Sequence, residues 1–223
     1  MRASAAAVWQ EVHSERRRLV ADLAGLRDDE WRRPSLCPGW DVHDVLAHLV
    51  DTARTGRVVF VRDLLVARMD FDRANANGIA RHKRQDPRET LEALREAADL
   101  TRTPPARLVT RLVEAIVHGE DVRRPLGITG RYAEHAIVLA LVHQLRTPVS
   151  FGGGRERAAG LRLTDRGTGA AWGRGKDVEG DAVDLLLAVS GRPVDRQRLA
   201  GDGAPDLAGT APGPSAPDTA PPR

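Results

Sequence analysis

Apolar residues recur at helical spacing through most of the first 145 residues. In residues 8–26 they fall on one side of a helix, which predicts an amphipathic helix with one buried face. The members of this stripe are Val12, Leu19, Val20, Leu23 and Leu26. Similar patterns predict helices at residues 41–68, 87–100, 106–118 and 133–145. The N-terminal part of the chain is therefore expected to be helical.

Capping and turn residues mark the expected helix ends. Asp41 follows the turn signal Pro38-Gly39 as an N-cap, and Asp44 takes the acidic third position of a start that resembles a capping box. Pro104-Pro105 predicts the start of the helix at residue 106, and Gly119 is expected to stop or bend it. Residues 70–86 are polar, so we predict a loop or a broken helix there.

The pattern changes after Pro148. Glycines at 152–154 form a linker, residues 161–164 alternate as a strand, and residues 170–173 are expected to pair back on it. Asp181 is expected to cap a helix at 182–189. From Gly203 onward large apolar groups are almost absent, which predicts a disordered tail.

These patterns predict a mainly α protein made of a four-helix bundle and a small α+β domain. The bundle is assigned to residues 1–147, the α+β domain to 148–203 and the disordered tail to 204–223. A bundle of about 145 residues is long enough to bury a core without disulfide bonds. The single cysteine, Cys37, cannot form an intramolecular disulfide, which fits the cytoplasm.

Composition argues against two classes of partner. The net charge is only +3, basic and acidic residues are interleaved, and aromatic residues make up 4% of the chain, so nucleic acid is not expected as a partner. No stretch approaches the roughly 18 to 20 apolar residues of a membrane span, so we expect no membrane contact. Oligomeric state is left open by the sequence.

A possible metal site is indicated by Glu114 and His118, which lie four residues apart and so share one helix face. With His48 from another helix they would supply two imidazoles and a carboxylate, which leaves an open position as in catalytic zinc sites and non-haem iron sites. The same spacing occurs on many plain surface helices. Glu114 and His118 belong to a polar stripe with Arg111 and Asp121, which is either a solvated face or the lining of a cleft.

Three segments resemble the mycothiol-dependent maleylpyruvate isomerase family of DinB-like proteins. They are residues 31–49, 114–127 and 178–192. The resemblance implies a DinB-like metal-binding bundle whose ligands are His48, Glu114 and His118, with a divalent metal, most simply Zn²⁺, and mycothiol as the thiol cosubstrate.

The chemistry that the resemblance implies is activation of a low-molecular-weight thiol. A cation stabilises the thiolate, which is the nucleophilic form and would attack a small electrophilic substrate. The outcome would be isomerisation of a cis double bond or transfer of the thiol. Arg192 and Arg81 are candidate catalytic residues that would bind a substrate carboxylate, although both are also compatible with plain surface roles.

Two other functions are compatible with the sequence. One is a non-catalytic DinB-like protein that binds a small molecule or a partner. The other is a metal-dependent hydrolase in which the open position activates water. The substrate itself cannot be read from the sequence.

Overall fold

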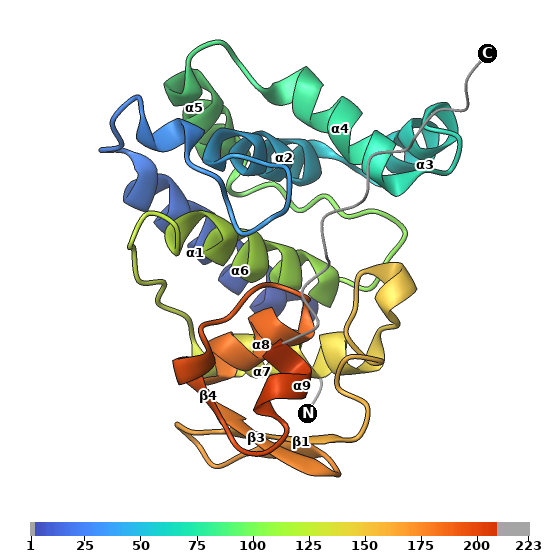
Figure 1. Ribbon diagram of the computed structural model, residues 1–223. Helices are drawn as coiled ribbons and strands as arrows, with labels where there is room; N and C mark the ends of the chain where they lie inside the picture. The colour runs from blue at the N-terminus through green and yellow to red at the C-terminus, as the bar shows by residue number, and fades with distance from the viewer. Residues whose placement is uncertain (1–2, 209–223) are drawn as a thin grey trace, which may run out of the picture. The chain divides into compact units, whose positions relative to one another are not determined.

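The computed structural model describes residues 3–208, which divide into two compact units between Gln144 and Leu145 (Figure 1). Sequence patterns place the boundary three residues later, between 147 and 148. The N-terminal unit is helical. Its elements are α1 (Ala5–Leu23), the 3-10 turn η1 (Glu30–Arg32), α2 (Val42–Arg54), α3 (Arg57–Val66), α4 (Phe71–His82), α5 (Pro87–Ala97), α6 (Val109–Arg123) and α7 (Glu134–Arg146), the last ending just past the division.

Four helices form the bundle by packing in a ring. Helices α1 and α2 each contact both α5 and α6, so α1, α5, α2 and α6 follow one another around a shared core. The helix expected at 133–145 exists as α7, but α7 is not one of these four. The core cluster of the bundle contains Leu91 and Leu94 of α5 but none of the buried side chains of α7. The short helix predicted at 87–100 therefore completes the bundle.

The predicted start of α2 is confirmed. Asp41 accepts a hydrogen bond from the backbone N–H of Asp44 at 2.6 Å, and the Asp44 carboxylate accepts one from the backbone N–H of Asp41 at 3.1 Å. Lys83 binds both carboxylates. This capping box fixes where the helix begins, and hence which side chains of α2 face each neighbouring helix.

The structure changes two expectations between residues 41 and 86. The single helix predicted at 41–68 is wrong, because it is interrupted at Thr55 and Gly56, which adopt extended backbone angles and separate α2 from α3. The polar segment predicted as a loop or a broken helix contains the helix α4. Asp70 caps α4, and the helix packs on α2 at Gly78, where an added Cβ would lie 2.5 Å from the Asp51 carboxylate. Tertiary packing stabilises this polar helix.

Helix α6 also differs from its predicted bounds. It begins at Val109, after the turn that follows the two prolines, and it continues through Gly119 to Arg123. Position 119 is a glycine because the Arg123 and Glu15 side chains occupy the space that a Cβ would need. A Cβ there would lie 2.8 Å from Arg123 Nη1 and 3.1 Å from Glu15 Oε1. The helix therefore continues for more than one turn beyond His118, and this extension carries Glu120, Asp121 and Arg123.

A buried ionic network joins α1 to α6. The Arg123 guanidinium, 1% exposed, binds Glu15 and Asp22 of α1 and donates a hydrogen bond to the Tyr132 hydroxyl at 2.9 Å. The Tyr132 hydroxyl in turn donates to Glu120. Burial raises the pKa of Tyr132, and the charge of Glu15 raises it further, so the phenol keeps its proton. Each polar group in this network has a partner, as a buried polar cluster requires.

The C-terminal unit is a small α+β fold, as expected. Its sheet has the order β2-β1-β3-β4, in which β1 and β3 are parallel and the outer two pairings are antiparallel. Helices α8 and α9 pack on it. The elements are η2 (Val149–Phe151), β1 (Leu161–Asp165), β2 (Ala171–Gly173), β3 (Lys176–Gly180), α8 (Ala182–Val189), η3 (Arg196–Arg198), β4 (Leu199–Ala200) and α9 (Ala204–Ala208).

The predicted strands and helix of this unit are confirmed, with one correction at its end. The strand at 170–173 pairs with β1, and α8 begins after Asp181 and ends before Gly191, whose φ is +77°. The disordered tail was predicted to start at 204, but Ala204–Ala208 form α9 and Leu207 is buried. The rest of the predicted tail, 209–223, lies outside the described residues. Across residues 3–208, no helix combines the length and apolar character needed to cross a bilayer.

The buried network generates a stability prediction. Replacing Arg123 by Met leaves the buried Glu15 carboxylate with only the half-exposed Arg18 at 3.4 Å, and removing one member of a buried ion pair typically costs about 3–5 kcal/mol of unfolding free energy. Urea unfolding followed by circular dichroism measures the change. The control is Arg95→Met on α5, whose partner Glu92 is exposed, and such surface pairs contribute about 0–1 kcal/mol. Equal losses in the two variants would contradict a structural role for the network.

Candidate metal and thiol site

Two histidine rings and a tryptophan meet between α2 and α6. His48 of α2 and His118 of α6 have ring centroids 4.8 Å apart at an edge-to-face angle of 74°. The Trp40 ring, from the turn before α2, lies 5.0 Å from His48 and 6.3 Å from His118. Residues separated by 70 positions in the chain thus form one aromatic cluster in the N-terminal unit.

His48 is buried without hydrogen bonds. The residue is 6% exposed, its Nδ1 has no hydrogen-bond partner, and its Nε2 makes none with a residue in the described range 3–208. Burial lowers the pKa of His48 to about 3, with a further contribution from the nearby His118. The ring is therefore neutral near pH 7 and carries a lone pair on one of its nitrogens. A buried polar group of this kind is costly unless a ligand satisfies it.

His118 is oriented by an acidic neighbour one turn later on α6. Its Nδ1 lies 2.9 Å from Oδ2 of Asp121, a residue with no exposed surface. Because a carboxylate oxygen accepts, the proton of the neutral imidazole belongs on Nδ1 and the lone pair on Nε2. A carboxylate behind a histidine in this way fixes the ring and its tautomer, as it does behind metal-binding histidines.

Glu114 lies one turn before His118 on the same helix. Its Oε2 is 2.7 Å from Arg111 Nη2, and the side chain of Thr52 on α2, whose hydroxyl donates to the Leu49 carbonyl, lies beside the carboxylate. Burial alone would raise the pKa of Glu114, but the charge of Arg111 and smaller contributions from His48, Thr52 and His118 together outweigh this effect, so the pKa is lowered. The carboxylate is therefore ionised and directed toward α2.

Of the three predicted ligands, His48 and His118 are in contact, and Glu114 lies within electrostatic reach of both. The polar stripe of α6 faces the bundle, not solvent. The donors suit a divalent cation, because both rings present nitrogen lone pairs and the third group is an ionised carboxylate. As the side chains stand, Glu114 is bound to Arg111, and within residues 3–208 no three His, Cys, Asp or Glu side chains are arranged to hold a metal ion together.

The two predicted catalytic arginines occupy different units. Arg81 of α4 lies in the N-terminal unit, where it binds Asp63 at 2.9 Å and Asp51 at 3.4 Å. Asp51 is on α2 one turn after His48 and interacts electrostatically with Glu114. Arg192 lies in the C-terminal unit after α8, where its guanidinium donates a hydrogen bond to the Ser190 carbonyl.

Several residues of the site were not singled out from the sequence. Trp40 has no spacing that relates it to the two histidines, yet it forms one wall of the histidine cluster. Thr52 had no signal beyond lying four residues after His48 on the same helix. Arg111 was recognised as part of the polar stripe, and its spacing of three from Glu114 is the signal that predicts their ion pair.

Residues 12–107 match the mycothiol maleylpyruvate isomerase N-terminal domain. Over these residues the chain is similar to the mycothiol maleylpyruvate isomerase family. The match supports the family expected from the sequence. The matched range includes Trp40 and His48, while Glu114 and His118 follow it.

Two crystal structures share the fold of the chain. They are the mycothiol-dependent maleylpyruvate isomerase, at 15% sequence identity, and a mutant of that enzyme, at 14%. Each superposition has a TM-score of 0.64 and covers 91% of this chain and 94% of the other. At such low identity the likeness establishes the fold, and the chemistry has to be argued from the site. A search of curated proteins gives no sequence match.

The pairing of His118 with Asp121 generates a prediction about its tautomer. In metal-free protein, long-range ¹H–¹⁵N spectra of labelled histidine are expected to show His118 protonated on Nδ1, because Asp121 accepts from that nitrogen. Asp121→Ala is expected to shift the population toward the tautomer protonated on Nε2. Asp99→Ala, which removes an exposed partner of Arg17, should leave the spectrum of His118 unchanged. Observing Nε2 protonation in the unmodified protein would contradict the assignment.

Proposed function

We propose that this protein is a metal-dependent and mycothiol-dependent isomerase or thiol S-transferase that acts on a small electrophile. The observation that carries the proposal is the buried His48 ring, which lacks hydrogen-bond partners and lies against His118, whose Nε2 also has none within residues 3–208. The match of residues 12–107 to the mycothiol maleylpyruvate isomerase N-terminal domain supports the thiol and the reaction class.

His48, Glu114 and His118 would hold the metal, and Zn²⁺ is the ion that best suits two imidazoles and one carboxylate with an open position. When bound, such a cation lowers the pKa of a thiol so that the thiolate predominates near neutral pH. Asp121 keeps the Nε2 lone pair of His118 available. Arg111 keeps Glu114 ionised.

The surrounding residues would prepare the site for a thiolate. Trp40 covers one side of both imidazoles, which excludes water from a nucleophile that water would otherwise stabilise. Arg81 is held by Asp51 and Asp63 next to α2, and it would bind a carboxylate of the substrate with its planar fork. We assign the same kind of role to Arg192, in the C-terminal unit.

For an isomerase, the proposed reaction is reversible addition of the thiolate to a cis double bond conjugated to a carbonyl group. The sulfur forms a bond to one alkene carbon, and the electron pair moves to the carbonyl oxygen. The former double bond is then single and rotates. Return of the electron pair expels the thiolate and leaves the trans isomer, so the thiol is regenerated. For an S-transferase, protonation of the adduct would instead retain the carbon–sulfur bond.

The metal ligands generate the first test. Purified protein reconstituted with Zn²⁺ and dialysed is expected to contain one equivalent by elemental analysis. Removing an imidazole ligand by His48→Ala or His118→Ala should weaken metal binding by at least about 100-fold, beyond the 10–100-fold typical of losing a residue that only orients a ligand. His135→Ala on α7, whose side chain is half exposed, should retain the metal. Stoichiometric zinc in both ligand variants would rule out this ligand set.

The reaction generates the second test. Zinc-loaded protein is mixed with mycothiol and maleylpyruvate, and the cis and trans isomers are followed by ¹H NMR, while mass spectrometry detects mycothiol conjugates of other electrophiles. Turnover is expected only with the thiol present, and Arg81→Gln is expected to raise KM for a carboxylate substrate. Activity without thiol would indicate a hydrolase. Metal binding without turnover of any electrophile would indicate a binding protein.

A further inference from the structure

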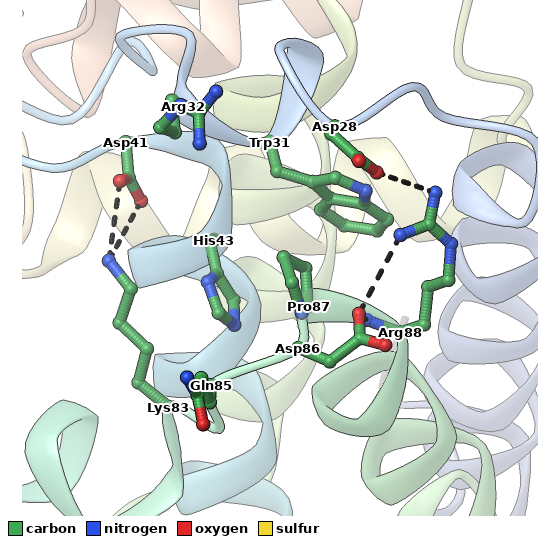
Figure 2. A pocket seen from close by; sticks show the side chains of 10 residues that line it. All are labelled: Asp28, Trp31, Arg32, Asp41, His43, Lys83, Gln85, Asp86, Pro87 and Arg88. Atoms are coloured by element: carbon green, nitrogen blue, oxygen red, sulfur yellow. Dashed lines mark hydrogen bonds and ion pairs between the residues drawn. The ribbon is translucent and has the colours of Figure 1, made fainter.

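A cavity of about 510 Å³ opens on the N-terminal unit where α2 and α5 begin (Figure 2). Three chain segments line it: residues 28–32 around η1, residues 41–43 at the start of α2, and residues 83–88 at the start of α5. A volume of this size lies within the roughly 300–1,000 Å³ of small-molecule sites. The proposed metal site does not account for it.

The cavity lies on a different side of α2 from the metal site. His43, which lines the cavity, contacts Thr90 of α5, whereas His48 contacts His118 of α6. Five residues along a helix correspond to about 140° of rotation, so the two histidines point toward different neighbours. A ligand in the cavity would therefore bind independently of the metal.

The carboxylates of the cavity are already engaged as acceptors. Asp41 accepts from the backbone of Asp44 and from Lys83, which also binds Asp44. On the opposite wall Arg88 binds Asp28 at 2.8 Å and Asp86 at 3.7 Å, as the dashed lines in Figure 2 show. Asp86 also accepts from the backbone N–H of Arg88. The acidic side chains thus have little capacity left for a ligand's donors.

His43 presents an unused donor to the cavity. The Thr90 hydroxyl oxygen accepts from the backbone N–H of Arg84 at 3.0 Å, and it lies 2.8 Å from His43 Nε2, to which it can donate its proton. Burial lowers the pKa of His43, and the charge of Lys83 lowers it further, so the ring is neutral. In the tautomer in which Thr90 donates to Nε2, the ring proton is on Nδ1, which has no hydrogen-bond partner within residues 3–208.

Three other side chains carry unused donors. The Trp31 indole is 1% exposed and its Nε1 has no hydrogen-bond partner, and in Figure 2 this nitrogen faces the side of the cavity occupied by Asp28 and Arg88. Arg32 forms no ion pair, and Gln85 no side-chain hydrogen bond, with any residue between 3 and 208. A buried indole N–H without an acceptor is a group that a ligand can satisfy.

We propose that this cavity binds a small organic carboxylate with an apolar body. A carboxylate offers only acceptors, which matches the unused donors of His43, Arg32 and Trp31. The N-termini of α2 and α5 both open here and favour negative charge. The Trp31 and Pro87 rings form an apolar wall for the rest of the ligand.

The electrostatic balance of the cavity permits an anion. Its lining contains three carboxylates and three cations, so the charges cancel before a ligand binds. Two of the cations, Lys83 and Arg88, pair with those carboxylates, and Arg32 is the cation left over. The anion would therefore be bound mainly by Arg32 and by the neutral donors, and the affinity should depend on Arg32.

In the experiment, the full chain is first freed of metal with a chelator. It is then titrated separately with phenylacetate, its neutral analogue phenylacetamide and inorganic phosphate. Phenylacetate is expected to bind saturably and to shift the indole N–H resonance of Trp31, identified by its loss in Trp31→Phe. Arg32→Gln should raise the dissociation constant about tenfold, the effect of losing one charge-assisted hydrogen bond. Two control variants should leave the dissociation constant for phenylacetate unchanged. They are His48→Ala and Arg57→Gln, which removes an exposed arginine outside the cavity.

Four outcomes would overturn the proposal. They are the absence of saturable phenylacetate binding, equal binding of phenylacetamide, equal binding of phosphate, and unchanged affinity in Arg32→Gln. Loss of binding in His48→Ala would instead assign the ligand to the proposed metal site. Because Arg32 is an exposed residue without side-chain partners, its variant is expected to fold, and the test does not depend on the stability of Trp31→Phe.

Discussion

The packing of α2 against α6 is the contact on which the candidate site depends, because it buries polar groups that then need partners. His118 is satisfied on one side by Asp121, and Glu114 by Arg111. His48 is the exception, since it is buried with no hydrogen bond. Buried polar groups in stable proteins are almost always paired, and those that are not mark positions where something else binds.

The ionic network between α1 and α6 determines how far α6 extends past this contact. Arg123 occupies the space beside Gly119 and binds Glu15 and Asp22 of α1, which holds the last turns of α6 against the bundle. Because the helix continues to Arg123, Asp121 stands one turn after His118 and can orient it. The structural network and the candidate site therefore share one helix and depend on the same glycine.

Helix α2 connects the two candidate sites of the N-terminal unit. Its capping box fixes the helix start, so His43 faces α5 and the cavity, while His48 faces α6 and the histidine cluster. The two histidines are both neutral, but they offer different groups to a ligand. His43 retains a hydrogen bond to Thr90 and offers a proton, whereas His48 makes no hydrogen bond and offers a lone pair.

The helical class, the start of α2 and the proposed metal ligands could be predicted from local periodicity, local capping and short motifs. The other features depend on how the helices pack against one another. Polar residues 71–82 form a helix because α2 packs on them, and Gly119 continues α6 because Arg123 needs its space. Whether the polar stripe of α6 faced solvent or another helix could not be read from its own spacing, since that depends on which surface α2 covers.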